Sequence, residues 1–134
     1  MKSTAGSGSD LSFEELKAKL QREKQLSVRV VTGSMEPVIQ IGDELLVEDI
    51  QEPLKLFDII VYWNGSVYIC HFVWSLNRHT HNAGERWVVT RSLASSREDF
   101  PVLESGILGR VVDREIPFSK KLWIVLKAKF FKFR

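Results

Sequence analysis

The chain is poor in the residues that would tie it together covalently or hold it across a membrane. Cys70 is the single cysteine among 134 residues, so an internal disulfide is excluded, and a lone cysteine is typical of the core. No apolar run approaches the roughly 20 residues that span a bilayer, and the N-terminus has no apolar signal segment. We therefore expect a cytoplasmic protein, with association at a membrane surface as the alternative.

The chain also lacks a large excess of charge of either sign. There are 19 Lys and Arg residues against 17 Asp and Glu residues, which gives a formal net charge of +2. Because nucleic-acid-binding domains concentrate basic residues, we expect no nucleic-acid partner. His71, His79, His81 and Cys70 do not have the spacing typical of zinc ligands, so we expect no metal and no cofactor.

The N-terminal part of the chain divides into two segments. Residues 1–10 are rich in Ser and Gly and are predicted to form a disordered arm. Residues 11–26 are predicted to form an amphipathic helix, because Ser12 and Glu15 fit a capping box. Its apolar stripe comprises Phe13, Leu16 and Leu20.

Residues 27–116 show the period-two pattern and β-branched content of short strands. The pair Asn64-Gly65 separates two apolar runs and is a strong hairpin signal. The expected strands are 28–33, 44–48, 57–63, 66–74, 86–91 and 107–114. We expect a mainly β domain with a coiled or barrel-like sheet, and a helix at each end of the chain.

Residues 117–134 contain six basic residues and no acidic one, interspersed with aromatic and aliphatic residues. We expect a basic-aromatic helix here. Two interpretations stay open. Lysines can reach around such a helix to a membrane surface, or the helix packs on the sheet with a solvated basic end.

The sequence Thr-Gly-Ser-Met-Glu-Pro at 32–37, followed by Gly42-Asp43, places the Ser34 hydroxyl at a bend between two extended segments. A serine hydroxyl is a poor nucleophile unless a base lies beside it. His71 lies in the middle of the strand expected at 66–74, both faces of which are apolar. It is therefore either a buried structural histidine or that base.

These motifs resemble the S24/S26 serine peptidases, which include the LexA-type self-cleaving repressors and the type I signal peptidases. The resemblance covers roughly residues 28–112. It is greatest to the endoplasmic-reticulum-type signal peptidases, whose motif is Gly-Ser-Met-Glu-Pro and whose base is a histidine on the hairpin. It implies a signal-peptidase or LexA-type peptidase domain over 27–116.

The resemblance also implies the catalytic residues. Ser34 would be the nucleophile, His71 the base, and Asp99 the carboxylate that orients the imidazole. Leu93 stands where the family has an Asp, so Glu98 is the alternative to Asp99. A serine endopeptidase is the expected activity, with a catalytically inactive peptide-binding scaffold of the same fold as the alternative.

The oxyanion hole would be formed by the Ser34 backbone N–H and the Thr32 hydroxyl. The substrate would be a leader, signal or precursor peptide, bound as an extended strand along the edge near residues 28–32, with small residues beside the cut. The residues expected to contact it are Val30, Val31, Met35 and Pro37. Asp43 is expected to shape its loop rather than to react.

Overall fold

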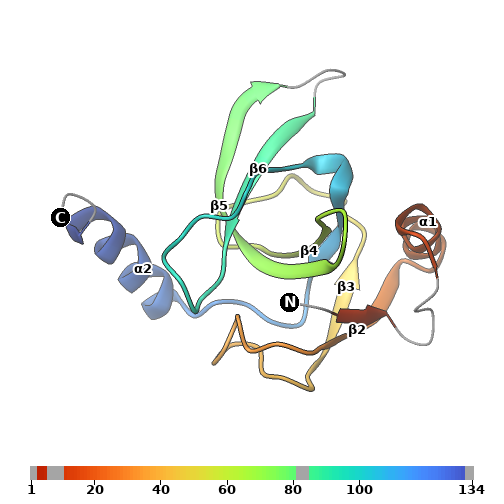
Figure 1. Cartoon of the computed structure of the whole chain (residues 1–134), viewed down its shortest axis with the longest axis horizontal. Coiled ribbons are helices and arrows are strands. Elements are labelled where there is room, and N and C mark those ends of the chain that lie inside the picture. The colour runs from red at the N-terminus through yellow and green to blue at the C-terminus, as the bar shows by residue number, and fades with distance from the viewer. Residues whose placement is uncertain (1–2, 6–10, 81–84, 132–134) are drawn as a thin grey trace.

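The structure is a computed structural model that describes residues 3–5, 11–80 and 85–131 (Figure 1). Its main element is one antiparallel sheet with the strand order β1-β2-β3-β8-β4-β5-β6-β7. The strands are β1 (Ser3–Ala5), β2 (Gln25–Val30), β3 (Glu44–Glu48), β4 (Ile59–Trp63), β5 (Tyr68–Thr80), β6 (Arg86–Arg91), β7 (Val102–Leu103) and β8 (Ile107–Val111). The mainly β prediction is confirmed. The sheet is strongly curved but is not closed into a barrel, with β1 and β7 as its edges.

Three helical segments complete the fold: α1 (Phe13–Glu23), the 3₁₀ turn η2 (Glu104–Gly106) and α2 (Phe118–Phe131). The predicted capping box of α1 is present, because Glu15 N donates to Ser12 Oγ at 3.1 Å and Ser12 N donates to Glu15 Oε1 at 3.2 Å. Helix α1 covers the sheet with Leu16 and Leu20. A helix near each end of the chain was predicted and is confirmed.

The prediction of a disordered arm at 1–10 is wrong for Ser3–Ala5, which forms β1 and pairs antiparallel with β2. The Ser- and Gly-rich composition does not predict this strand, because β1 forms by hydrogen bonding to the edge of β2. The other residues of that arm lie outside the described part of the chain. Strand β5 is also longer than predicted and continues to Thr80, because its far half pairs with β6.

The core has two parts. The larger lies between α1, the sheet and the segment that follows β2, and it includes Met35, Ile39 and Cys70, each 0% exposed. Burial raises the pKa of the Cys70 thiol to about 12, so Cys70 is a neutral core residue. The smaller cluster lies around Ile60 and Val88. The buried Met35 and Ile39 fix the segment that carries Ser34.

Candidate active site

Ser34 lies in the connection between β2 and β3. Gly42 has a φ of +93°, which favours glycine, and its N–H donates to Val30 O at 2.8 Å. Asp43 Oδ2 accepts a hydrogen bond of 2.9 Å from Gln40 N. Asp43 therefore shapes this turn, as the sequence predicts.

His71 lies in the middle of β5, opposite Ile60 of β4. The hairpin that joins these strands turns at Asn64 and Gly65, as predicted. Asn64 Oδ1 accepts hydrogen bonds from the backbone N–H groups of Ser66 and Val67, and Gly65 has a φ of +102°. The hairpin holds His71 in a central strand, where it is 9% exposed.

The imidazole of His71 is hydrogen-bonded to a carboxylate. Its Nδ1 lies 2.6 Å from Asp99 Oδ2. Thr90 Oγ1 donates to the same oxygen at 2.7 Å, and Tyr62 OH lies 3.1 Å from Thr90 Oγ1. Because the Thr90 hydroxyl gives its proton to Asp99, Tyr62 is the donor to Thr90. The four side chains form one partly buried chain of hydrogen bonds.

Burial and hydrogen bonding act in opposite directions on Asp99. Burial is the largest influence and by itself raises the pKa of the carboxyl. The hydrogen bonds from His71 and Thr90, together with the charge of His71, outweigh it and lower the pKa of Asp99 below its usual value. Burial raises the pKa of Tyr62 to about 12, so its hydroxyl stays protonated as a donor.

Glu98 has a different partner. Its Oε2 accepts a hydrogen bond of 3.0 Å from Trp74 Nε1. Glu98 is paired with Arg91 in an isolated antiparallel bridge, and adjacent residues of an extended chain point in opposite directions. The carboxylate beside His71 is therefore Asp99 and not Glu98.

Among the buried polar atoms that lack a hydrogen-bond partner within the described ranges are Nε2 of His71 and Oγ1 of Thr32. Such atoms are uncommon in folded proteins, and each one calls for an explanation. The Ser34 hydroxyl is thus not hydrogen-bonded to Nε2 in this structure. Catalytic hydrogen bonds often form only when substrate is bound.

One loop connects the Ser34 segment to the His71 partner. Ser34 O accepts hydrogen bonds of 3.1 Å from both Leu93 N and Ala94 N. The same loop returns to β6, where Asp99 N donates to Thr90 O at 2.9 Å. The Leu93 side chain packs against the core.

The residues predicted to contact substrate differ in exposure. The Val30 and Met35 side chains are 1% and 0% exposed, so only their main-chain atoms could contact a peptide. The prediction that both side chains contact substrate is therefore wrong, because they are buried in the core. Val31 and Pro37 are exposed, as expected of contact residues. The edge of β2 from Val28 to Val30 is covered by β1.

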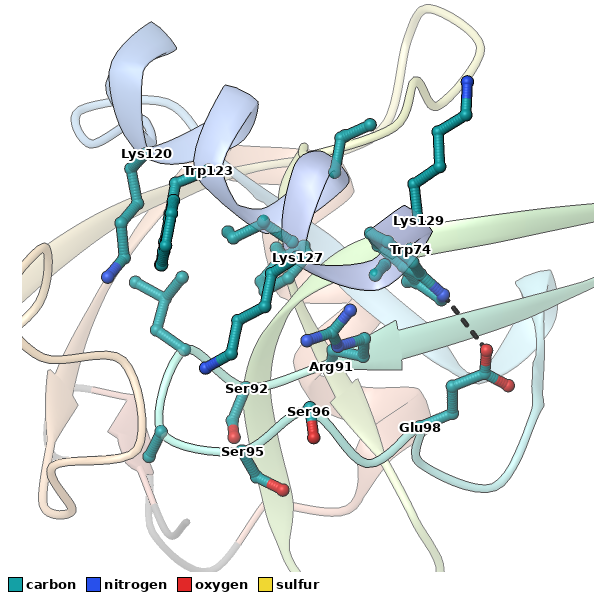
Figure 2. A pocket seen from close by; sticks show the side chains of 16 residues that line it. Trp74, Arg91, Ser92, Ser95, Ser96, Glu98, Lys120, Trp123, Lys127 and Lys129 are labelled. Carbon is teal, nitrogen blue, oxygen red and sulfur yellow. Dashed lines mark hydrogen bonds between the residues drawn. The ribbon is translucent and has the colours of Figure 1, made fainter. Parts of the chain in front are cut away.

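A groove of about 1210 Å³ lies between α2 and residues 92–98, next to the loop that contacts Ser34 (Figure 2). The Arg91 guanidinium lies 4.4 Å from the centre of the Trp74 ring at its floor. No sequence pattern predicted this groove. Thr90 and Tyr62 were not predicted as site residues either, although alternation along their strands is the signal that could have placed both beside His71.

Within the described residues, no group of three His, Cys, Asp or Glu side chains could hold a metal ion. The backbone of His79 is part of β5, and His81 lies outside the described residues. None of the helices in the described ranges has the length and apolar character to cross a bilayer. Comparison of the chain with protein-family models, curated proteins and solved structures found no match in any of the three.

Proposed function

We propose that the protein is a serine endopeptidase in which Ser34 is the nucleophile, His71 the general base and Asp99 the orienting carboxylate. The observation that carries this proposal is the 2.6 Å hydrogen bond between His71 Nδ1 and Asp99 Oδ2. That bond fixes the proton of the neutral imidazole on Nδ1, which leaves the lone pair on Nε2. Nε2 is the buried nitrogen without a partner in the described chain, so it is the atom that can take a proton from Ser34.

In the first half of the reaction, Ser34 Oγ attacks a peptide carbonyl while its proton passes to His71 Nε2. The imidazolium then returns this proton to the leaving amine, which departs and leaves an acyl-enzyme. A water molecule attacks the ester by the same route and releases the acid. Asp99 stays ionised throughout and stabilises the imidazolium, because its pKa is lowered.

The tetrahedral intermediate carries an oxyanion, which hydrogen-bond donors must stabilise. The Ser34 backbone N–H and the Thr32 hydroxyl are the proposed pair. The buried Thr32 Oγ1 supports this role, because among the described residues it has no acceptor for its proton. One such donor contributes about 3 kcal/mol to stabilising the transition state.

The proposed substrate is a leader, signal or precursor peptide with small residues beside the cut, as in the S24/S26 peptidases that the sequence resembles. It would bind as an extended strand on β2. The pairing of β1 with β2 supports this binding mode, since it is an example of an extended segment on that edge. A substrate that pairs with residues 28–30 has to displace β1.

The test is labelling with a serine-reactive acylating probe. The intact chain should label, and Ser34→Ala and His71→Gln should not. Ser95→Ala is the matched control, because Ser95 is an exposed serine of the neighbouring loop, and this variant should label normally. Circular dichroism should show that the variants are folded.

Labelling that persists in Ser34→Ala would remove Ser34 as the nucleophile. No labelling and no cleavage of a peptide library by the folded chain would favour the alternative, an inactive peptide-binding scaffold. The replacement of the family's Asp by Leu93 is the feature that motivates this alternative.

A further inference from the structure

Helix α2 exposes most of its large apolar side chains. The exposed fraction is 77% for Phe118, 69% for Phe130 and 54% for Trp123, and it lies between 37% and 47% for three more. Those three are Leu122, Val125 and Leu126. Such a concentration on one short helix marks an interaction surface, because single exposed apolar residues are usually scattered.

The exposed apolar residues share one side of the helix. Phe118, Leu122, Leu126 and Phe130 follow one another at intervals of four, which places them along one side. Ile124 lies on the opposite side and is buried against the core at 8% exposure. Figure 1 shows α2 extending away from the sheet, and the exposed fractions show that its apolar side is not covered by the described part of the chain.

The charged residues of α2 are all basic. Helix α2 contains Lys120, Lys121, Lys127 and Lys129 and no acidic residue. Figure 2 shows Lys120 and Lys127 directed toward residues 92–96 across the groove, whereas Lys129 points away. At helical spacing Lys120 and Lys127 border the apolar side toward the groove and Lys121 borders it on the other side, whereas Lys129 lies within the apolar side. Arg91 and Glu98 add one cation and one anion to the lining of the groove.

We propose that α2 is a docking surface for an anionic phospholipid bilayer. A helix with an exposed apolar side and neighbouring lysines can lie in the plane of a membrane surface, with its aromatic and aliphatic side chains among the acyl chains. The lysine stems reach outward so that the ammonium groups meet lipid phosphates. A basic surface without acidic residues on the helix fits anionic lipids and no cationic partner.

This orientation has a consequence for the active site. Residues of α2 and residues 92–98 line the same groove, and Leu93 and Ala94 of that loop bind the Ser34 carbonyl. A bilayer bound by α2 would therefore lie beside the loop that contacts the Ser34 segment. The membrane surface and the bound peptide would meet at this loop.

The test is co-sedimentation of the full chain with vesicles of phosphatidylcholine, with and without phosphatidylglycerol. We expect binding only to the anionic vesicles. Leu122→Asn combined with Phe130→Asn should lower the partition coefficient at least about tenfold. Lys120→Gln and Lys127→Gln should each lower it about fivefold. Leu56→Asn is the matched control, since Leu56 is 53% exposed but is not part of α2, and it should bind normally.

A second measurement detects insertion directly. The tryptophan emission of the chain should shift to the blue on anionic vesicles, and Trp123→Phe should abolish the shift. Three results would overturn the proposal. They are no binding to anionic vesicles at low salt, undiminished binding of the Leu122→Asn, Phe130→Asn chain, and a concentration-dependent dimer that the same double substitution dissolves. The last result would identify a second copy of the chain as the occupant.

Discussion

Asp99 Oδ2 lies 2.6 Å from Nδ1 of His71, although 28 residues separate them in the chain. The neighbouring carboxylate, Glu98, is instead bonded to Trp74. The two adjacent acids therefore have different partners, and this difference makes their roles separable by experiment.

Asp99→Asn should lower kcat by about 10³- to 10⁴-fold, because an amide no longer fixes the proton of His71 on Nδ1. Glu98→Gln keeps an acceptor for Trp74 Nε1 and should change kcat less than about threefold. Hydrolysis of a cleaved peptide identified from a library is the measurement. Equal losses in the two variants would contradict the assignment of Asp99.

Thr32→Val should lower kcat by about 10²-fold or more with little change in KM, because the hydroxyl acts on the oxyanion and not on the bound peptide. The change is nearly isosteric, and the replaced oxygen has no protein partner within the described ranges, so folding should be retained. Thr32→Ser is the control and should keep most of the activity. A loss confined to KM would place Thr32 in substrate binding instead.

Asp99 should also make stability depend on pH. Its pKa is lower in the folded chain than the usual 3.8, so its contribution is complete above that value and is lost as pH falls through the folded pKa. Urea unfolding of the intact chain and of Asp99→Asn should therefore give free energies that converge in acid. A difference that is the same at neutral and acid pH would show that Asp99 is not linked to proton uptake.

Thr4→Pro should open the edge of β2. Val30 directs its N–H to Asp43 and its carbonyl to Gly42, so by alternation Arg29 directs its own groups to Thr4 in β1. Proline removes the Thr4 N–H from this pair. In the Ser34→Ala background, an extended peptide should bind about three- to tenfold more tightly, measured by fluorescence anisotropy.

Thr4→Val keeps the backbone N–H and is the control for this change. If both variants bind the peptide as the parent does, β1 does not compete with substrate for β2.

The elements that sequence predicted well depend on residues close together in the chain. The capping box joins Ser12 to Glu15, and the hairpin turn depends on Asn64 and its neighbours. Strand ends were less predictable, because β5 continues to Thr80 only through its pairing with β6. The predicted disorder of the N-terminal arm was wrong at β1 for the same reason. Strand β1 forms by hydrogen bonding to the edge of β2, which is distant in the sequence.

The sequence by itself determined the mainly β fold, the bend that carries Ser34 and the burial of His71, because periodicity and turn residues act locally. Tertiary structure alone decided that Asp99 rather than Glu98 faces His71, that Thr90 and Tyr62 support it, and that Met35 belongs to the core. Each of these depends on the register between segments distant in the chain. Register is set by the packing and hydrogen bonding of the whole sheet, so it cannot be predicted from any short stretch of sequence.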